Sequence, residues 1–192
     1  MTALPEPWRL LNIAEYEALG EDDQVHWELQ EGILVMSPSP RPRHNVVGGL
    51  VFNQVRQQLP PELIAVPDVD INLELVPDDE PATVRRPDLV VVDSSEYERV
   101  EDEGGTIRAA CVHIVVEIVS PGSRRMDYKI KRSEYADAGI PNYWIIDLTR
   151  PISLLSLRLT DELGYVDDGE MTGTYTTTSP CPLTIQLNQL DR

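Results

Sequence analysis

The chain has 192 residues, of which 41% are hydrophobic and 26% are charged, a composition typical of a globular protein that can bury a sizeable core. Its formal net charge of −17 argues against a protein that coats duplex nucleic acid, because broad phosphate binding needs a basic surface. No apolar stretch approaches the roughly 20 residues of a membrane-spanning helix, and residues 1–7 lack the basic start and apolar run of a signal peptide. We expect a single cytoplasmic domain over residues 1–192, without membrane contact and with reduced thiols at Cys111 and Cys181.

The N-terminal part predicts a short helix and a strand pair. Residues 12–19 are expected to be helical because Asn12 and Glu15 form a capping box at the start. Residues 26–35 are expected to form two strands that turn near Gly32.

The middle of the chain predicts a longer helix and three strands. Apolar residues recur at helical spacing over residues 42–59, whereas residues 69–75 alternate and indicate a half-exposed strand. Residues 89–92 and 111–119 are continuous apolar runs, which indicates strands that are covered on both faces.

A βαβ unit is expected next. Residues 125–138 predict a helix that ends at Gly139, and residues 143–147 predict a core strand parallel to the one before the helix. The later short strands could extend the sheet or form a small antiparallel flap. The sequence thus predicts a mixed α/β fold with a core over about residues 12–150 and a C-terminal β extension over residues 151–192.

Charged residues are unevenly distributed. Acidic residues concentrate at positions 78–80, 96–103 and 161–170, and these runs are expected to be solvated loops. Residues 124–132 hold five basic residues and one acid, so this short segment is locally positive. A small phosphate-facing cleft therefore stays compatible with the acidic chain as a whole.

Two predicted core strands carry an acid. Asp88 begins one strand directly after Pro87, and Glu117 interrupts the apolar run of the other. A buried acid is costly unless it is paired, hydrogen-bonded or bound to a metal, and two converging carboxylates suit Mg²⁺. The alternative is an ion pair at a strand end, for Asp88 with Arg85 or Arg86. For Asp88 the ion pair is at least as strong an interpretation as a metal-binding role, whereas for Glu117 a functional role is favoured over an ion pair.

The chain has two lysines, Lys129 and Lys131, and both fall on the helix after the Glu117 strand. Two positions on a helix are about 200° apart, so both cannot face one site, and periodicity leaves open which lysine turns inward. A lysine on the outer face of the helix would only solubilise it. The turn from Ser120, with Arg124 close by, could accept an anion or could be a plain connection.

Several separate motifs together resemble one known family. They are the run Val116–Ser123, then Asp127, Lys131 and Tyr135, then residues 139–147; further upstream come residues 86–92, residues 27–32, residues 36–38 and His44. In this order they resemble the Uma-type endonucleases of the restriction-endonuclease-like superfamily, whose signature is Pro-Asp followed by Asp/Glu-x-Lys. The resemblance covers about residues 12–150.

The resemblance implies a restriction-endonuclease-like mixed sheet flanked by helices, Mg²⁺-dependent phosphodiester hydrolysis with Mn²⁺ as a substitute, and a homodimer. It implies metal ligands at Asp88 and Glu117, and an additional acid near the metal or its water at Glu28. Val119 stands where the superfamily signature has its lysine. In the Uma-type pattern the lysine comes from the following helix, which points to Lys131.

Two classes of function follow. The first is a Mg²⁺-dependent nuclease, acting on DNA in preference to RNA, with Lys131 aiding the attacking water. His44, near Arg41 and Arg43 at a predicted helix start, could contact phosphate together with Ser120 and Arg124, or be a surface or capping residue. The second is a catalytically inactive homodimeric interaction or nucleic-acid-binding module, which the acidic composition and the missing strand lysine favour.

Overall fold

The computed structural model describes residues 9–20, 26–36, 40–120 and 122–191. Ser37, Pro38 and Pro121, which belong to the motifs above, lie outside the described residues. No helix in these ranges is long and apolar enough to cross a membrane. The assignment of residues 1–192 to one domain stays a prediction.

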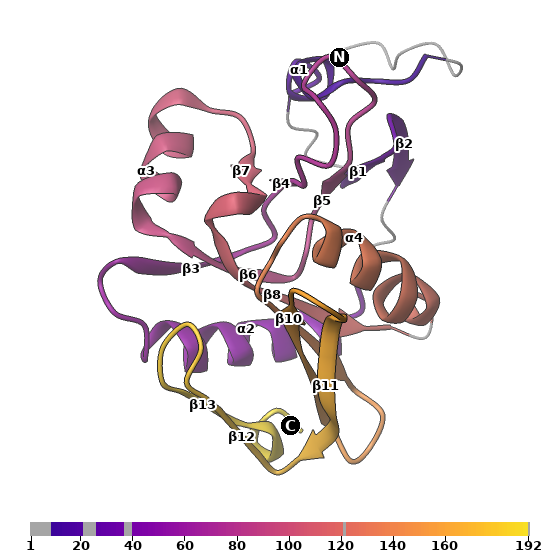
Figure 1. Cartoon of the computed structure of the whole chain (residues 1–192). Coiled ribbons are helices and arrows are strands. Elements are labelled where there is room, and N and C mark those ends of the chain that lie inside the picture. Colours follow the sequence, from indigo (N-terminus) through magenta and orange to yellow (C-terminus); the bar gives the residue numbers. More distant parts are fainter. Residues whose placement is uncertain (1–8, 21–25, 37–39, 121, 192) are drawn as a thin grey trace.

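A six-stranded mixed sheet occupies the centre of the molecule (Figure 1). Its central pair is parallel, and the other neighbouring strands are antiparallel. The strands in spatial order are β11 (Gly164–Thr172), β10 (Ser153–Thr160), β9 (Asn142–Asp147), β8 (Val112–Val119), β6 (Leu89–Asp93) and β3 (Leu63–Pro67). The parallel pair β8–β9 is the βαβ unit that the sequence predicted.

Both faces of this sheet are covered, as the continuous apolar runs of β6 and β8 require. Alternate residues such as Val91 and Val116 face a core with the helix α2 (Pro42–Arg56). Residues of the other parity, such as Val90 and Val115, face a second core beneath α4 (Lys131–Asp137). In Figure 1, α2 and α4 lie on opposite sides of the sheet.

A second, five-stranded sheet packs beside the first and contributes to the site. Its strands in spatial order are β2 (Ile33–Met36), β1 (Trp27–Gln30), β5 (Val84–Arg85), β4 (Ile71–Asn72) and β7 (Ile107–Arg108). The turn between β1 and β2 places Glu31 and Gly32 at positive φ, as the predicted strand pair requires. The helix α1 (Ile13–Glu17) begins with the predicted capping box at Asn12.

The segment between β8 and β9 begins with a π-helix (Met126–Ile130) that continues directly into α4. The Lys131 amide N–H donates to the Met126 carbonyl oxygen, five residues back. A π-helical turn inserts one residue into a helix and occurs frequently at functional sites. The prediction of a helix from 125 to 138 is confirmed, with this irregularity at its start.

The C-terminal part fulfils both predicted alternatives. β10 and β11 extend the six-stranded sheet, and a separate hairpin of β12 (Thr174–Thr177) and β13 (Leu183–Gln186) packs on the core beneath α2. Short 3₁₀ turns lie at Ala109–Cys111 and Leu187–Gln189.

Three sequence predictions were wrong. The acidic run 96–103 is the helix α3 (Ser94–Glu103), in which Glu96 is buried against two arginines and is not a solvated loop residue. The run 161–170 falls mainly within β11, which pairs along β10. The strand expected over 69–75 is only β4, while β3, which follows Pro60-Pro61, was not predicted because its short apolar run carries no periodic signal.

Candidate active site

Asp88 and Glu117 lie at the junction of two neighbouring antiparallel strands. Leu89 at the start of β6 is opposite Val116 of β8, so Asp88 comes next to the position of Glu117. The Asp88 Oδ2 accepts a hydrogen bond from the Ile118 backbone N–H at 2.6 Å. Neither Arg85 nor Arg86 pairs with Asp88, so the ion pair considered for it does not form.

Lys131 is the lysine that turns toward these acids. Its ammonium is buried and lies 2.7 Å from Glu117 Oε1, whereas Lys129 is exposed. The Nζ atom of Lys131 also lies 3.0 Å from Glu28 Oε1, so two glutamates from different sheets share one lysine. An ammonium has three donors, which leaves one N–H of Lys131 for a further partner.

Glu28 reaches the site from β1 of the second sheet. Its Oε2 accepts from Arg85 at 3.0 Å, and its Oε1 accepts from the Arg86 backbone N–H at 3.1 Å. Burial by itself raises the pKa of Glu28, but Lys131 and Arg85 more than offset this, so the pKa lies below its ordinary value. Glu31, at the turn, is exposed, so Glu28 is the residue of this strand that joins the site.

Arg85 has no exposed side-chain surface and was not predicted as a site residue. Its guanidinium donates two hydrogen bonds to Glu134 on α4, at 2.7 and 2.6 Å, besides the one to Glu28. A planar guanidinium matches a carboxylate in this bidentate way. Arg85 therefore links β1 and β5 to the helix that carries Lys131. Nothing in the local sequence marks it, apart from its place just before Arg86-Pro87-Asp88.

Asp127 and Tyr135 also face the site, although no role was predicted for either residue from the sequence. Tyr135 is buried and donates through its hydroxyl to Glu117 Oε1 at 2.9 Å. Asp127 is 3% exposed, and the Tyr143 hydroxyl donates to its backbone carbonyl at 3.0 Å. Asp127 and Tyr135 lie four residues before and after Lys131, so all three share one helix face, and this spacing could have identified both as site residues.

Negative charge predominates around Lys131, in an acid–lysine cluster of Glu28, Asp88, Glu117, Asp127 and Lys131. Burial is the largest cause that raises the pKa of Glu117 to about 8; Lys131 opposes this shift, and Asp88 adds to it. Burial likewise raises the pKa of Asp127, with Lys131 opposing. The acids around Lys131 keep its pKa above the ordinary value in spite of burial. The cluster therefore stabilises added positive charge.

The donors of this cluster fit a hard divalent cation. Carboxylate oxygens are the ligands that Mg²⁺ prefers, and the excess of acids over bases would be relieved by one. Glu117 Oε2 accepts no hydrogen bond from the described residues, so one oxygen of this carboxylate is available. In the described ranges no three His, Cys, Asp or Glu side chains are grouped closely enough to hold a metal. A metal here would thus take two protein carboxylates and complete its coordination with water and substrate phosphate.

A pocket of about 470 Å³ opens beside the cluster, and we call it the arginine-lined pocket. Three segments line it: the start of α2 with Arg41, Arg43 and His44; the end of β8 with Ser120 and Arg124 beyond it; and residues 147–149. His44 belongs to both places, because its Nε2 lies 2.7 Å from Asp88 Oδ1. The hydrogen bond that the His44 ring makes to the Asp88 carboxylate is the main cause that raises the pKa of His44.

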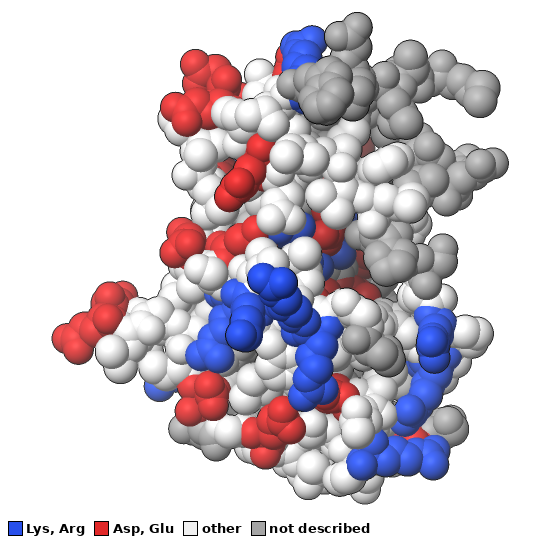
Figure 2. Space-filling model, turned by 90° about the vertical axis from the view of Figure 1, so that its right-hand side faces the viewer, with Lys and Arg blue, Asp and Glu red and all other residues white. Residues whose placement is uncertain are grey.

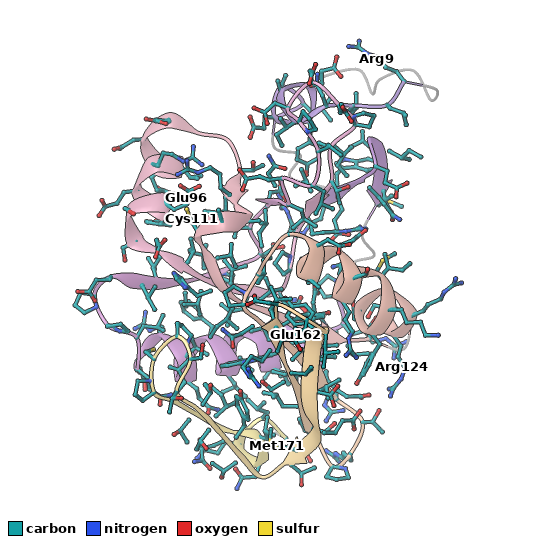
Figure 3. The ribbon with its side chains drawn as sticks, in the orientation of Figure 1. Arg9, Glu96, Cys111, Arg124, Glu162 and Met171 are labelled. Atoms are coloured by element: carbon teal, nitrogen blue, oxygen red, sulfur yellow. The ribbon has the colours of Figure 1, made fainter. Side chains whose placement is uncertain are left out.

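The structure therefore brings His44, Ser120 and Arg124, the three residues proposed for substrate contact, to one pocket. Arg124 precedes the π-helix Met126–Ile130, and Figure 3 labels it near the right-hand edge of the molecule. The space-filling view of that side shows basic side chains gathered over its middle and lower part, with acidic ones between them (Figure 2). Basic side chains are thus grouped on part of this face although the net charge of the chain is −17.

The mixed sheet with helices on both faces is the fold class that the sequence predicted. A family model described as "Uma2: Putative restriction endonuclease" matches residues 13–172, and the chain belongs to this family. The structure is similar to the crystal structure of "a putative nuclease belonging to DUF820" from Anabaena variabilis ATCC 29413, with a TM-score of 0.68 and 16% identity over 94% of this chain and 97% of that chain. At this identity the similarity shows the fold. No curated protein matches the chain.

Proposed function

We propose that the protein is a Mg²⁺-dependent nuclease that hydrolyses phosphodiester bonds of nucleic acid. The observation that carries this proposal is the acid–lysine cluster, in which Lys131 contacts both Glu28 and Glu117 while the carboxylates exceed the cations. Membership of a family of endonucleases supports the same activity. DNA is the proposed substrate in preference to RNA, and the proposed assembly is a cytoplasmic homodimer.

In the proposed mechanism Asp88 and Glu117 would hold Mg²⁺, and the ion would supply activation of the attacking water and charge stabilisation at the phosphate oxygens. Lys131 has a third N–H donor that can orient the attacking water or neutralise the phosphate. Glu28 holds Lys131 from the second sheet through the 3.0 Å contact of its Oε1 with Nζ, and it is proposed as the additional acid near the metal or its water. Tyr135 orients Glu117 through its hydrogen bond to Oε1.

Substrate contacts are proposed for the residues beside the cluster. His44, at 2.7 Å from Asp88, is placed to contact a phosphate that approaches the acids, since its raised pKa favours the protonated ring. Ser120 and Arg124 line the same pocket and offer a hydroxyl and a guanidinium to phosphate oxygens.

The test uses Asp88→Asn and Glu117→Gln, which preserve shape and remove charge. With Mg²⁺ and a panel of single- and double-stranded DNA and RNA, each variant should cleave roughly 100-fold more slowly than the parent or not at all. Unchanged circular dichroism spectra would show that both variants fold. Cleavage at the parental rate by both folded variants would refute the mechanism.

A catalytically inactive binding module is the second candidate. It is favoured by the absence of a three-residue metal-ligand group in the described part of the chain and by the acidic composition. This candidate predicts no Mn²⁺ binding by calorimetry. The nuclease predicts Mn²⁺ binding by the parent protein and its loss in Asp88→Asn.

A further inference from the structure

Building on the nuclease proposed above, we propose that the arginine-lined pocket holds an unpaired nucleobase next to the scissile phosphate. The substrate class of this site would then be single-stranded nucleic acid, and a continuous duplex would be a poor substrate.

The arginine-lined pocket lies next to Asp88 and Glu117. Val119 and Ser120 line the pocket and directly continue the strand that carries Glu117. Two residues of a strand span roughly 7 Å, so pocket and carboxylate are close neighbours. On the other side, His44 lines the pocket and contacts Asp88 at 2.7 Å. A nucleotide whose phosphate lies over the acids can therefore place its base in the pocket.

The walls of the pocket have the chemistry that an unpaired base requires. Val119 and Leu148 give the pocket apolar surface, and Arg41, Arg43 and Arg124 give it guanidinium groups. Unpaired bases are recognised by apolar contact and by stacking on aromatic or guanidinium planes. The volume of about 470 Å³ falls within the roughly 300–1,000 Å³ of small-molecule pockets.

Two of these guanidinium groups are held in place by neighbouring residues. Arg124 pairs with Asp147 and lies over the Tyr128 ring, 4.9 Å from its centroid. Arg43 is likewise held, by the Leu148 carbonyl oxygen at 3.0 Å and by Asp191 at 3.1 Å. A guanidinium with a fixed plane loses less side-chain entropy when a base stacks on it.

A continuous duplex does not fit this pocket. A duplex keeps its bases stacked inside and presents phosphates on a convex outer surface, so it cannot fill a concave pocket without extruding a nucleotide. Tight duplex binding instead needs many phosphate contacts. The chain, at −17, offers a limited basic surface for such contacts (Figure 2).

The experiment measures binding without cleavage. In EDTA, fluorescence anisotropy would compare a fluorescein-labelled single-stranded DNA oligonucleotide with its blunt duplex, using the parent protein, Arg124→Ala and Arg125→Ala. Arg125 is exposed, carries the same charge and is not part of the pocket wall, so it is the matched control. Thermal unfolding would confirm that all three proteins are folded.

The expected result is a preference of roughly tenfold or more for the single strand, in the range that one stacked base provides. Arg124→Ala should remove most of this preference, and Arg125→Ala should keep it. The pocket assignment would be overturned if the parent bound the single strand and the duplex with equal affinity. It would also be overturned if Arg124→Ala and Arg125→Ala reduced the preference for the single strand equally. If the protein preferred single-stranded DNA but showed no Mg²⁺-dependent cleavage, only the proposed nuclease activity would be refuted, because binding is measured without metal.

Discussion

Lys131 Nζ lies 2.7 Å from Glu117 Oε1, although the lysine belongs to a helix and the glutamate to the strand before it. The superfamily signature expects a lysine two residues after the glutamate, where this chain has Val119. The π-helical turn and α4 place Lys131 over β8, so its ammonium reaches Glu117 from the face of the sheet that α4 covers. The ion pair is thus made by packing between elements and not by one strand.

This pairing predicts the effect of removing the lysine. Lys131→Met should destabilise the protein by about 3–5 kcal/mol, because two buried glutamates lose their shared cation. Lys129→Met, on the exposed side, should change the free energy of unfolding by less than about 0.5 kcal/mol. Urea unfolding monitored by circular dichroism measures both. Equal destabilisation of the two variants would contradict the assignment of Lys131 to the interior.

Arg85 should prove as important for folding as Lys131. Arg85→Met leaves Glu28 and Glu134 without their buried guanidinium partner, so we expect a loss of about 3–5 kcal/mol. Arg86→Met is the matched control, since the Arg86–Asp70 pair is partly exposed and should contribute about 1 kcal/mol or less. Denaturant midpoints of the two variants would decide the order. If Arg86→Met were the more harmful change, the role of Arg85 in joining the sheets would be wrong.

The Tyr135 hydroxyl should support Glu117 specifically. Tyr135→Phe keeps the ring packed against Tyr143 but removes the hydrogen bond to Glu117 Oε1. We expect a destabilisation of about 1–2 kcal/mol and weaker Mn²⁺ binding in calorimetry, because Glu117 loses one of its two orienting partners. Tyr165→Phe, whose hydroxyl donates to the Ile140 carbonyl oxygen away from the acids, should lose stability without a change in Mn²⁺ affinity. The same Mn²⁺ affinity in both variants would argue against an orienting role.

Acid pH should weaken the stabilisation that a third buried glutamate, Glu96, provides outside the acid–lysine cluster. Glu96, which Figure 3 labels next to Cys111, accepts hydrogen bonds from Arg99 and Arg108. Burial raises its pKa, but these bonds more than offset that and lower the pKa from 4.5 to about 2. A depressed pKa means that the stabilisation is present above pH 4.5 and is lost as the pH falls toward 2.

Comparison with Glu96→Gln tests this sign. Near neutral pH the substitution should cost roughly 1–2 kcal/mol, a reduced value because both arginines are partly exposed. The difference from the parent should shrink as the pH falls below 4.5, whereas Glu98→Gln at an exposed position should show little difference throughout. Urea midpoints across this range provide the measurement. A difference that grows toward acid pH would show that the sign is wrong.

Local patterns predicted much of the fold correctly. The capping box at Asn12, the helix that begins at Pro42 and the parallel strands before and after α4 were all visible in the sequence. Each of these elements could be predicted because it depends on interactions between residues close in sequence or on an apolar run that must be buried. The acidic helix α3 was missed because its Glu96 is buried by arginines at positions 99 and 108, and charge pattern alone suggests a solvated loop.

The sequence by itself determined that the runs around residues 89–92 and 112–119 are buried strands, that Glu117 lies within one and that Asp88 directly precedes the other, because continuous apolar runs are legible without a structure. Periodicity left open which lysine turns inward, the family resemblance pointed to Lys131, and the structure places its ammonium beside Glu28 and Glu117. Only the tertiary structure decided that Arg85 joins Glu28 to Glu134. These contacts join residues from separate strands and a helix. Their geometry depends on how two sheets and α4 pack, which no local pattern encodes.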